Sequence, residues 1–137
     1  MNESAVKGFI VSDDEYEKGK ATEHAKRFSL YCKVGKSGRV FFEAIGMRTK
    51  TRKIWLTAAA RYIANQFDSG ISREIRLDEF STITGIKPDV ISARLAELGK
   101  RGFVTRTQRG AYVAQPVFFD TLLHMLDRLY GAKLNRS

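Results

Sequence analysis

The chain has 137 residues but a single cysteine, Cys32. One cysteine excludes an internal disulfide and a zinc site built from cysteines. No apolar stretch approaches the ~20 residues that a membrane-spanning helix needs, so we expect the chain not to cross a bilayer. The first residues, Met1-Asn2-Glu3-Ser4, show no basic region followed by an apolar one, as a secretory signal would. Together these absences favour a cytoplasmic protein.

Residues typical of catalytic and metal centres are also scarce. His24 and His124, the two histidines, belong to no paired-histidine or H-E-x-x-H motif. Gly35-Lys36-Ser37 suggests a phosphate-binding P-loop, but the earlier glycine of that motif is replaced by Leu30, and a strand rather than a helix is expected to follow. We therefore expect no enzymatic activity, no metal and no cofactor.

Positive charge is what the chain has in excess. Its 24 lysines and arginines outnumber its 15 acids. Residues 1–44 hold 8 basic and 7 acidic residues, whereas residues 45–137 hold 16 basic and 8 acidic ones. A localised positive field attracts a polyanion, most often nucleic acid and less often an anionic membrane surface. The alternative is a solvated basic surface that serves solubility.

The pattern along the chain predicts an arm followed by one α+β domain. Residues 1–27 contain a short apolar segment and then a charged stretch with little periodicity, so we expect a flexible or loosely structured arm there, with a strand or short helix as the alternative. The domain should span residues 28–137, with its core at 51–130. It should begin with a β-hairpin, in which turn residues join strands at 28–34 and 39–45.

Helical periodicity, capping residues and turn residues predict the rest of the domain. Gly85 ends a short helix, and Pro88 suits the first turn of the next one because its missing N–H would be unpaired there anyway. The predicted elements are a helix at 51–67, a β-like segment at 74–77, a helix at 79–84, a helix from Pro88 to near Gly102, strands at 103–107 and 111–115, and a helix at 117–130.

Three features of residues 77–115 occur together in this order. Gly85 occupies a tight turn between two helices, and Ile91, Leu95 and Leu98 lie on the inward face of the second one. Gly102-Phe103-Val104 then opens a hairpin. In these features the chain resembles the winged helix-turn-helix family over about residues 51–130. The resemblance implies a winged helix-turn-helix with an N-terminal β-hairpin and a C-terminal apolar helix, binding double-stranded DNA through the second helix in the major groove.

The resemblance also implies which residues contact DNA. Many family members carry arginine or a longer polar residue where this chain has Val90 and Ala93, so the outward helix face is poor in donors. Phosphate contacts dominate affinity, however, and basic residues surround this helix. The implied DNA-binding residues are Lys87, Asp89, Val90, Ser92, Ala93 and Arg94 on the helix, Arg52, Lys53, Arg76 and Lys100 around it, and Arg106, Gln108 and Arg109 in the wing.

The last predicted helix has apolar residues on nearly every side. Such a helix must be buried against more than one small core, so we expect a homodimer that presents two recognition helices to a roughly palindromic site. The alternative is a helix enclosed within the monomer by the N-terminal hairpin. The expected interface residues are Phe118, Leu122, Met125, Leu126 and Leu129.

Two roles remain open within the family. The chain ends its hairpin in a proline turn followed by aromatics, at 111–119, and this layout is similar to small plasmid replication initiator and copy-control proteins, which recruit host replication factors. The other role is a transcriptional repressor similar to the multiple-antibiotic-resistance regulators. A third hypothesis, of another class, is a winged-helix protein-interaction module without DNA activity. The donor-poor helix face favours this module, and the excess of bases in residues 45–137 argues against it.

Overall fold

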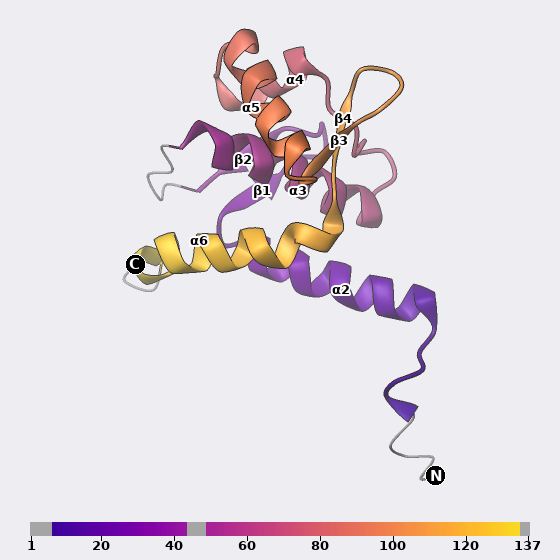
Figure 1. Cartoon of the computed structure of the whole chain (residues 1–137). Helices are drawn as coiled ribbons and strands as arrows, with labels where there is room; N and C mark the ends of the chain where they lie inside the picture. The colour runs from indigo at the N-terminus through magenta and orange to yellow at the C-terminus, as the bar shows by residue number, and fades with distance from the viewer. Residues whose placement is uncertain (1–6, 44–48, 135–137) are drawn as a thin grey trace.

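The structure is a computed structural model that describes residues 7–43 and 49–134 (Figure 1). Its helices and two small antiparallel hairpins form an α+β fold, as the sequence predicts. The elements are α2 (Asp13–Phe28), β1 (Cys32–Val34), β2 (Val40–Phe42), α3 (Lys50–Phe67), α4 (Leu77–Thr84), α5 (Pro88–Lys100), β3 (Val104–Arg106), β4 (Tyr112–Ala114), η1 (Pro116–Phe118) and α6 (Phe119–Leu134). Among the described residues, no helix is both long and apolar enough to span a membrane.

Helix α2 occupies much of the segment for which a loosely structured arm was predicted. Ser12 caps it by accepting a hydrogen bond from the backbone N–H of Glu15 at 3.5 Å, and the acids of the first turn suit the positive end of the helix dipole. The C-terminal half of α2 packs against α3 and α6 through Ala21, His24 and Phe28. A helix, which the sequence left as the alternative, therefore replaces the predicted loosely structured arm over residues 13–27, while residues 1–6 of that arm lie outside the described residues.

The predicted N-terminal hairpin is present but shorter. In β1 and β2, Cys32 pairs with Phe42 and Val34 with Val40. Phe28, predicted to start the first strand, ends α2 instead because its side chain packs edge-on against Phe119 of α6. Residues 44 and 45 of the predicted second strand lie outside the described residues.

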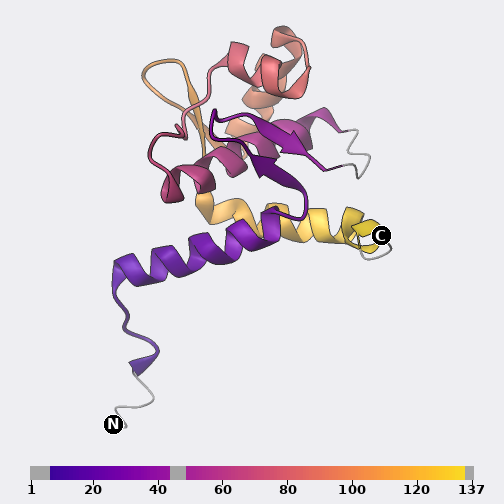
Figure 2. The ribbon, with the colours of Figure 1, turned by 180° about the vertical axis from the view of Figure 1, so that it is seen from behind.

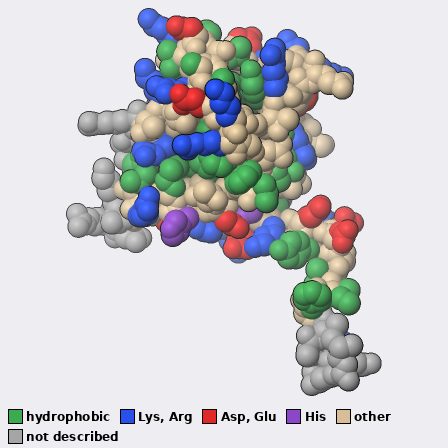
Figure 3. Space-filling view, viewed as in Figure 1, with side chains coloured by type: hydrophobic (Ala, Val, Ile, Leu, Met, Phe, Trp, Pro, Cys, Tyr) green, Lys and Arg blue, Asp and Glu red, His purple; other side chains and the backbone are tan. Residues whose placement is uncertain are grey.

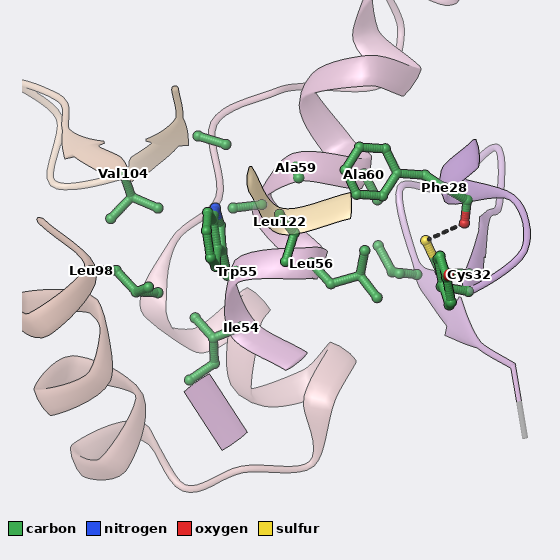
Figure 4. Close-up of a cluster of buried hydrophobic side chains, with 14 of the residues drawn as sticks. Phe28, Cys32, Ile54, Trp55, Leu56, Ala59, Ala60, Leu98, Val104 and Leu122 are labelled. Atoms are coloured by element: carbon green, nitrogen blue, oxygen red, sulfur yellow. Dashed lines mark hydrogen bonds between the residues drawn. The ribbon is translucent and has the colours of Figure 1, made fainter. Parts of the chain in front are cut away.

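Helix α3 is central to the core and contacts α2, α4, α5, both strands of the first hairpin and β4. It is buried along an uninterrupted stretch from Ile54 to Arg61, so it is covered on several sides. Figure 4 shows Leu98, Val104 and Leu122 gathered around its Ile54 and Trp55 side chains. The Trp55 ring also stacks on Phe103, with centroids 4.1 Å apart.

The elements from α4 to β4 follow the predicted order. Gly85 adopts the left-handed conformation, with φ 73° and ψ 12°, and its N–H donates to the Ser81 carbonyl, which closes α4. Within the predicted β-like segment at 74–77, a single bridge joins Ile75 to Tyr112 of β4, and Leu77 already belongs to α4. Strands β3 and β4 pair in antiparallel register, with Thr105 opposite Val113.

One side of helix α6 is buried against its own chain. Figures 1 and 2 show it beside α2, beneath the rest of the molecule. Leu122 and Leu126 are fully buried, so they are not at the surface where the predicted dimer interface would need them. Phe118 and Met125 are half-buried, and Leu129 is 40% exposed. The alternative of burial within the monomer describes this side of α6, with α2 rather than the hairpin packed against it.

Candidate nucleic-acid interface

Helix α5 is held at the surface by its apolar side and by the turn before it. Ile91, Leu95 and Leu98 are buried, as predicted. In the turn, the Ser81 hydroxyl donates to the Ile86 carbonyl at 2.6 Å, and the Ile86 N–H donates to the Thr84 hydroxyl at 3.2 Å. These bonds fix the angle at which α5 leaves α4.

Most of the predicted contact residues of α5 do lie on its open face. Lys87, Asp89, Ser92 and Ala93 are exposed. Val90 differs, because it is half-buried and packs against the core. Arg94 is half-buried too, and it faces Glu97 of its own helix at 3.4 Å. The open face therefore presents Lys87 and Ser92 as donors, an acid at Asp89, and small side chains.

The hairpin after α5 carries two exposed cations. Arg106, Gln108 and Arg109 are exposed, and neither arginine forms an ion pair within the described residues. The tip is closed by backbone bonds from Thr107 to Ala111, at 2.7 Å, and from Gly110 to Thr107, at 3.0 Å. Exposed guanidinium groups on a closed turn are suited to phosphate oxygens.

Arg76 lies near this hairpin. It is exposed at the N-cap of α4, next to Ile75, whose backbone pairs with Tyr112 of β4. The structure thus brings together the predicted cations of the α4 N-terminus and of the hairpin.

The remaining predicted cations gather at the opposite end of α5. Thr51 of α3 lines one surface hollow together with Lys100 and Arg101. At about 1.5 Å per residue, Lys100 lies about 20 Å along α5 from Lys87. Arg52 donates to the Thr49 hydroxyl at 2.7 Å, and the Lys53 ammonium lies 5.3 Å from the centre of the Phe42 ring. Lys100 is exposed, whereas Arg52 and Lys53 are half-buried and already have partners in the chain.

Figure 3 shows how charge is distributed over this face. Lys and Arg side chains lie at several separate places over its upper part, with a few acids between them. Acidic and apolar side chains share the projecting end of α2. The basic character of the second part of the chain is therefore spread around α5 rather than gathered in one patch.

Two arginines that the charge count places at the surface are used inside the fold. Arg61 is buried and donates to the carbonyls of Gly38 and Ser72 and, at 2.6 Å, to Glu79. Arg73 donates to Asn65 at 2.7 Å and lies over the Tyr62 ring. Neither role could be predicted from the sequence, because each partner is distant or has no recognisable spacing.

The shifted titratable groups lie away from α5. The hydrogen bond from His24, at 3.0 Å, holds the pKa of Asp120 below its usual value. For Asp127, burial raises the pKa, but hydrogen bonds from Tyr31 and Arg27 outweigh burial and lower it. Burial raises the pKa of the Cys32 thiol to about 12, so the thiol stays protonated at neutral pH. Within the described residues, no cluster of three or more potential metal ligands is present.

Comparison of the chain with protein-family models, with curated proteins and with solved structures finds no match.

Proposed function

We propose that the chain binds double-stranded DNA as a winged helix-turn-helix protein does, with α5 in the major groove and the β3–β4 hairpin against the phosphate backbone or the minor groove. The observation that carries this proposal is the geometry of α5. Its apolar side is buried, its other side is open, and the exposed Arg106 and Arg109 flank it. A helix of about 10–12 Å diameter fits a major groove about 12 Å wide.

The composition of the α5 face indicates how affinity and specificity are divided. The exposed cations around α5 supply phosphate contacts, which are independent of sequence. Base reading rests on Ser92, which bonds either a base or a phosphate, and on Ala93, whose methyl group suits a thymine methyl. We therefore expect a sequence preference that is modest compared with the electrostatic affinity.

We propose that the protein binds DNA in the cytoplasm in one of two roles. In the first it initiates plasmid replication or controls plasmid copy number, and in the second it regulates transcription. In either role the protein acts as a homodimer on a roughly palindromic site, with a host replication or transcription protein as a further partner. The layout of residues 111–119 supports the replication role. A footprint on DNA flanking the gene distinguishes the roles, since an origin shows repeated sites and a promoter a single operator.

A second candidate function is protein recognition by the same face. Ala93 and Ala96 are both exposed on α5, and small side chains allow another helix or strand to approach closely. In that case the partner is a polypeptide, and the affinity does not fall with salt concentration in proportion to the number of phosphates contacted.

The test is fluorescence anisotropy of the full chain with a random-sequence duplex over a salt series. DNA binding predicts that log affinity falls linearly with log salt, with a slope of about −0.9 per phosphate contacted. The double variant Arg106→Ala/Arg109→Ala should bind every duplex more weakly, and its slope should shrink by about two.

The matched control removes two positive charges from the other side of the molecule. Lys36→Ala/Arg39→Ala changes the exposed turn of the β1–β2 hairpin, which faces the viewer in Figure 2, opposite α5. This control should keep the wild-type slope. Equal slopes for the two double variants would contradict a role of the β3–β4 hairpin, and no binding at low salt would favour the protein-interaction function.

A further inference from the structure

The outward face of the β1–β2 hairpin carries an exposed aromatic ring between cations. Successive side chains of a strand point to opposite sides, so Lys33 and Phe41, which pair directly across the hairpin, lie on the same side. Arg39 lies two residues before Phe41 and therefore shares this side. The other side of the hairpin is buried at Cys32 and Val40. Phe41, in contrast, is 48% exposed, and both cations are exposed.

Gly35 lets the Phe41 ring lie across this face of the hairpin. A Cβ built on Gly35 would lie 3.1 Å from Cε2 of the ring, so a side chain there would require the ring to shift. The Arg39 guanidinium lies over the same ring, 5.0 Å from its centre. Nucleobases stack on aromatic rings and on guanidinium planes, because every base has a π-face. Phe41 and Arg39 together therefore form a surface suited to an unpaired base.

The turn that joins β1 and β2 adds positive charge beside the ring. Lys36 and Arg39 are exposed, and neither forms an ion pair within residues 7–43 and 49–134. Glu43 is an acid on the same face, but it lies 3.4 Å from the Lys33 ammonium, which neutralises it. Each base of a nucleic acid is accompanied by one phosphate, so unpaired cations beside a stacking surface are complementary to such a chain.

This turn is held in place from inside the fold. The Gly35 N–H donates to the Arg39 carbonyl at 2.8 Å, and the Gly38 N–H donates to the Gly35 carbonyl at 2.9 Å. The buried Arg61 guanidinium donates to the Gly38 carbonyl at 3.1 Å, and its own charge is paired with Glu79. The cations of the turn therefore sit on a fixed backbone, so less conformational freedom is lost when they bind a ligand.

We infer that the outward face of the β1–β2 hairpin binds single-stranded DNA, with a base stacked on Phe41 and the phosphates beside that base bound by Lys36 and Arg39. Duplex DNA does not suit this surface, because its bases are stacked on one another and offer no face to the ring. The hairpin lies opposite α5 (Figure 2), so one molecule has separate surfaces for a duplex and for an unpaired strand. The choice of DNA over RNA rests on the proposed function, and the two kinds of DNA are measured separately so that the failure of each is distinguishable.

The experiment measures the fluorescence anisotropy of a labelled oligothymidine of about 12 nucleotides, a usual site size, as the full chain is added. Phe41→Ala should weaken binding at least about five-fold, the lower limit for the loss of one stacked base. Phe41→Tyr keeps a ring and should bind as the wild type does, whereas Phe41→Leu keeps only apolar bulk and should bind more weakly than Phe41→Tyr. Lys36→Ala/Arg39→Ala should also weaken binding, and its slope of log affinity against log salt should shrink by about 1.4, or about 0.7 per lost phosphate contact.

Matched variants separate this surface from a general effect of aromatic rings or of charge. Tyr16→Ala removes a ring that is 56% exposed but follows the acids of the first turn of α2, so it should leave the affinity for oligothymidine unchanged. Arg106→Ala/Arg109→Ala should weaken duplex binding and keep the wild-type salt slope for oligothymidine. Phe41→Ala should keep the wild-type affinity for a duplex, which also shows that this variant is folded.

Several outcomes would overturn the inference. One is a wild-type chain that binds a duplex but no oligothymidine at low salt. Another is equal affinity for oligothymidine in the Phe41→Leu and Phe41→Tyr variants, since a ring would then not be needed. An oligouridine of the same length that binds more tightly than oligothymidine would overturn the assignment to DNA. Binding of oligothymidine without binding of a duplex would instead contradict the proposed function alone.

Discussion

Arg61 is a charged side chain enclosed in the core, and its bonds join three segments that are distant in sequence. Its guanidinium donates to the turn between β1 and β2 at Gly38, to the loop before α4 at Ser72, and to Glu79 of α4. A buried guanidinium is tolerated when its donors are satisfied and its charge is paired. Arg61 therefore fixes the position of α4, and through α4 that of the turn leading to α5.

Replacing this residue tests its role. Arg61→Met should lower the free energy of unfolding by about 2–3 kcal/mol, because two carbonyls and one carboxylate lose their partner. The loss should be smaller than for a fully buried pair, since the Glu79 side chain is 38% exposed and can be hydrated. Urea unfolding followed by the fluorescence of Trp55, the single tryptophan, measures it.

Arg94→Met is the matched control. Arg94 also pairs with a glutamate, but its side chain is 41% exposed and the N–O distance is 3.4 Å. An exposed pair of this kind contributes roughly 0–1 kcal/mol, so this variant should unfold nearly as the wild type does. Equal losses in the two variants would show that burial does not determine the contribution of Arg61.

Arg61 also shows what a sequence cannot reveal at the residue scale. In a charge count it is one of the 16 bases of residues 45–137, and it counts toward a field that attracts polyanions. Its partners lie 23, 11 and 18 residues away, without a recognisable motif. Net charge therefore overstates how many cations are available to a nucleic acid.

The elements that could be predicted are those whose turn residues, capping residues and apolar spacing lie close together in the sequence. The α4–turn–α5 segment depends on Gly85, on Pro88 at the first turn and on the spacing of Ile91, Leu95 and Leu98, all of which lie within fourteen residues. The structure places these residues as predicted, with helix bounds shifted by one or two residues. Val90 was placed wrongly, because its burial depends on neighbouring elements and not on its position in the helix alone.

Helix α2 was predicted only as an alternative, because its buried side is not a regular apolar stripe. Its buried residues are Ala21, His24 and Phe28, only one of which is large and apolar. A usable signal was present: Ser12 followed three residues later by Glu15 has the spacing of a capping box. Gly19 and the lack of an apolar stripe concealed it, since glycine lowers the helical character expected of the segment.

The turn at Gly85, which sets the direction of α5, allows a prediction about one helix end. Gly85→Ala should cost about 1–2 kcal/mol of folding stability, because a residue with a Cβ is strained in the left-handed conformation. The cost should come from the backbone alone, since a Cβ at this site would meet nothing within 4 Å. Thermal unfolding followed by Trp55 fluorescence measures the effect.

Gly131→Ala in α6 is the matched control. A Cβ at Gly131 also meets nothing within 4 Å, but this residue has no positive φ. Alanine favours a helix over glycine by about 0.5–1 kcal/mol, so this variant should be more stable than the wild type. Changes of the same sign in both variants would contradict the role assigned to the conformation of Gly85.

In the whole molecule, two groups of elements pack on α3, one formed by α4 to β4 and the other by α2 and α6. The elements from α4 to β4 surround one side of α3 and carry the proposed DNA-binding face, while α2 and α6 lie together beneath them (Figures 1 and 2). The contacts between α2 and α6 join residues 96 and 100 positions apart, as in the bonds from His24 to Asp120 and from Arg27 to Asp127. No local pattern encodes such pairs, so the apolar character of α6 was assigned to a second copy rather than to α2.

Truncation distinguishes the two halves of α2 at this scale. A chain that starts at Lys18 lacks only residues that are exposed or outside the described part, so its melting temperature should stay within a few degrees of the wild type.

A chain that starts at Leu30 lacks Phe28 and His24, which contact Phe119 of α6, and it uncovers the buried leucines of that helix. Burial of a side chain such as Phe contributes about 1.5–3 kcal/mol, so this chain should melt about 15 °C lower or aggregate. The fluorescence of Trp55 measures both melting temperatures. If the chain starting at Leu30 melted like the full chain, α2 would be an appendage, as the sequence suggested, and α6 would need another cover.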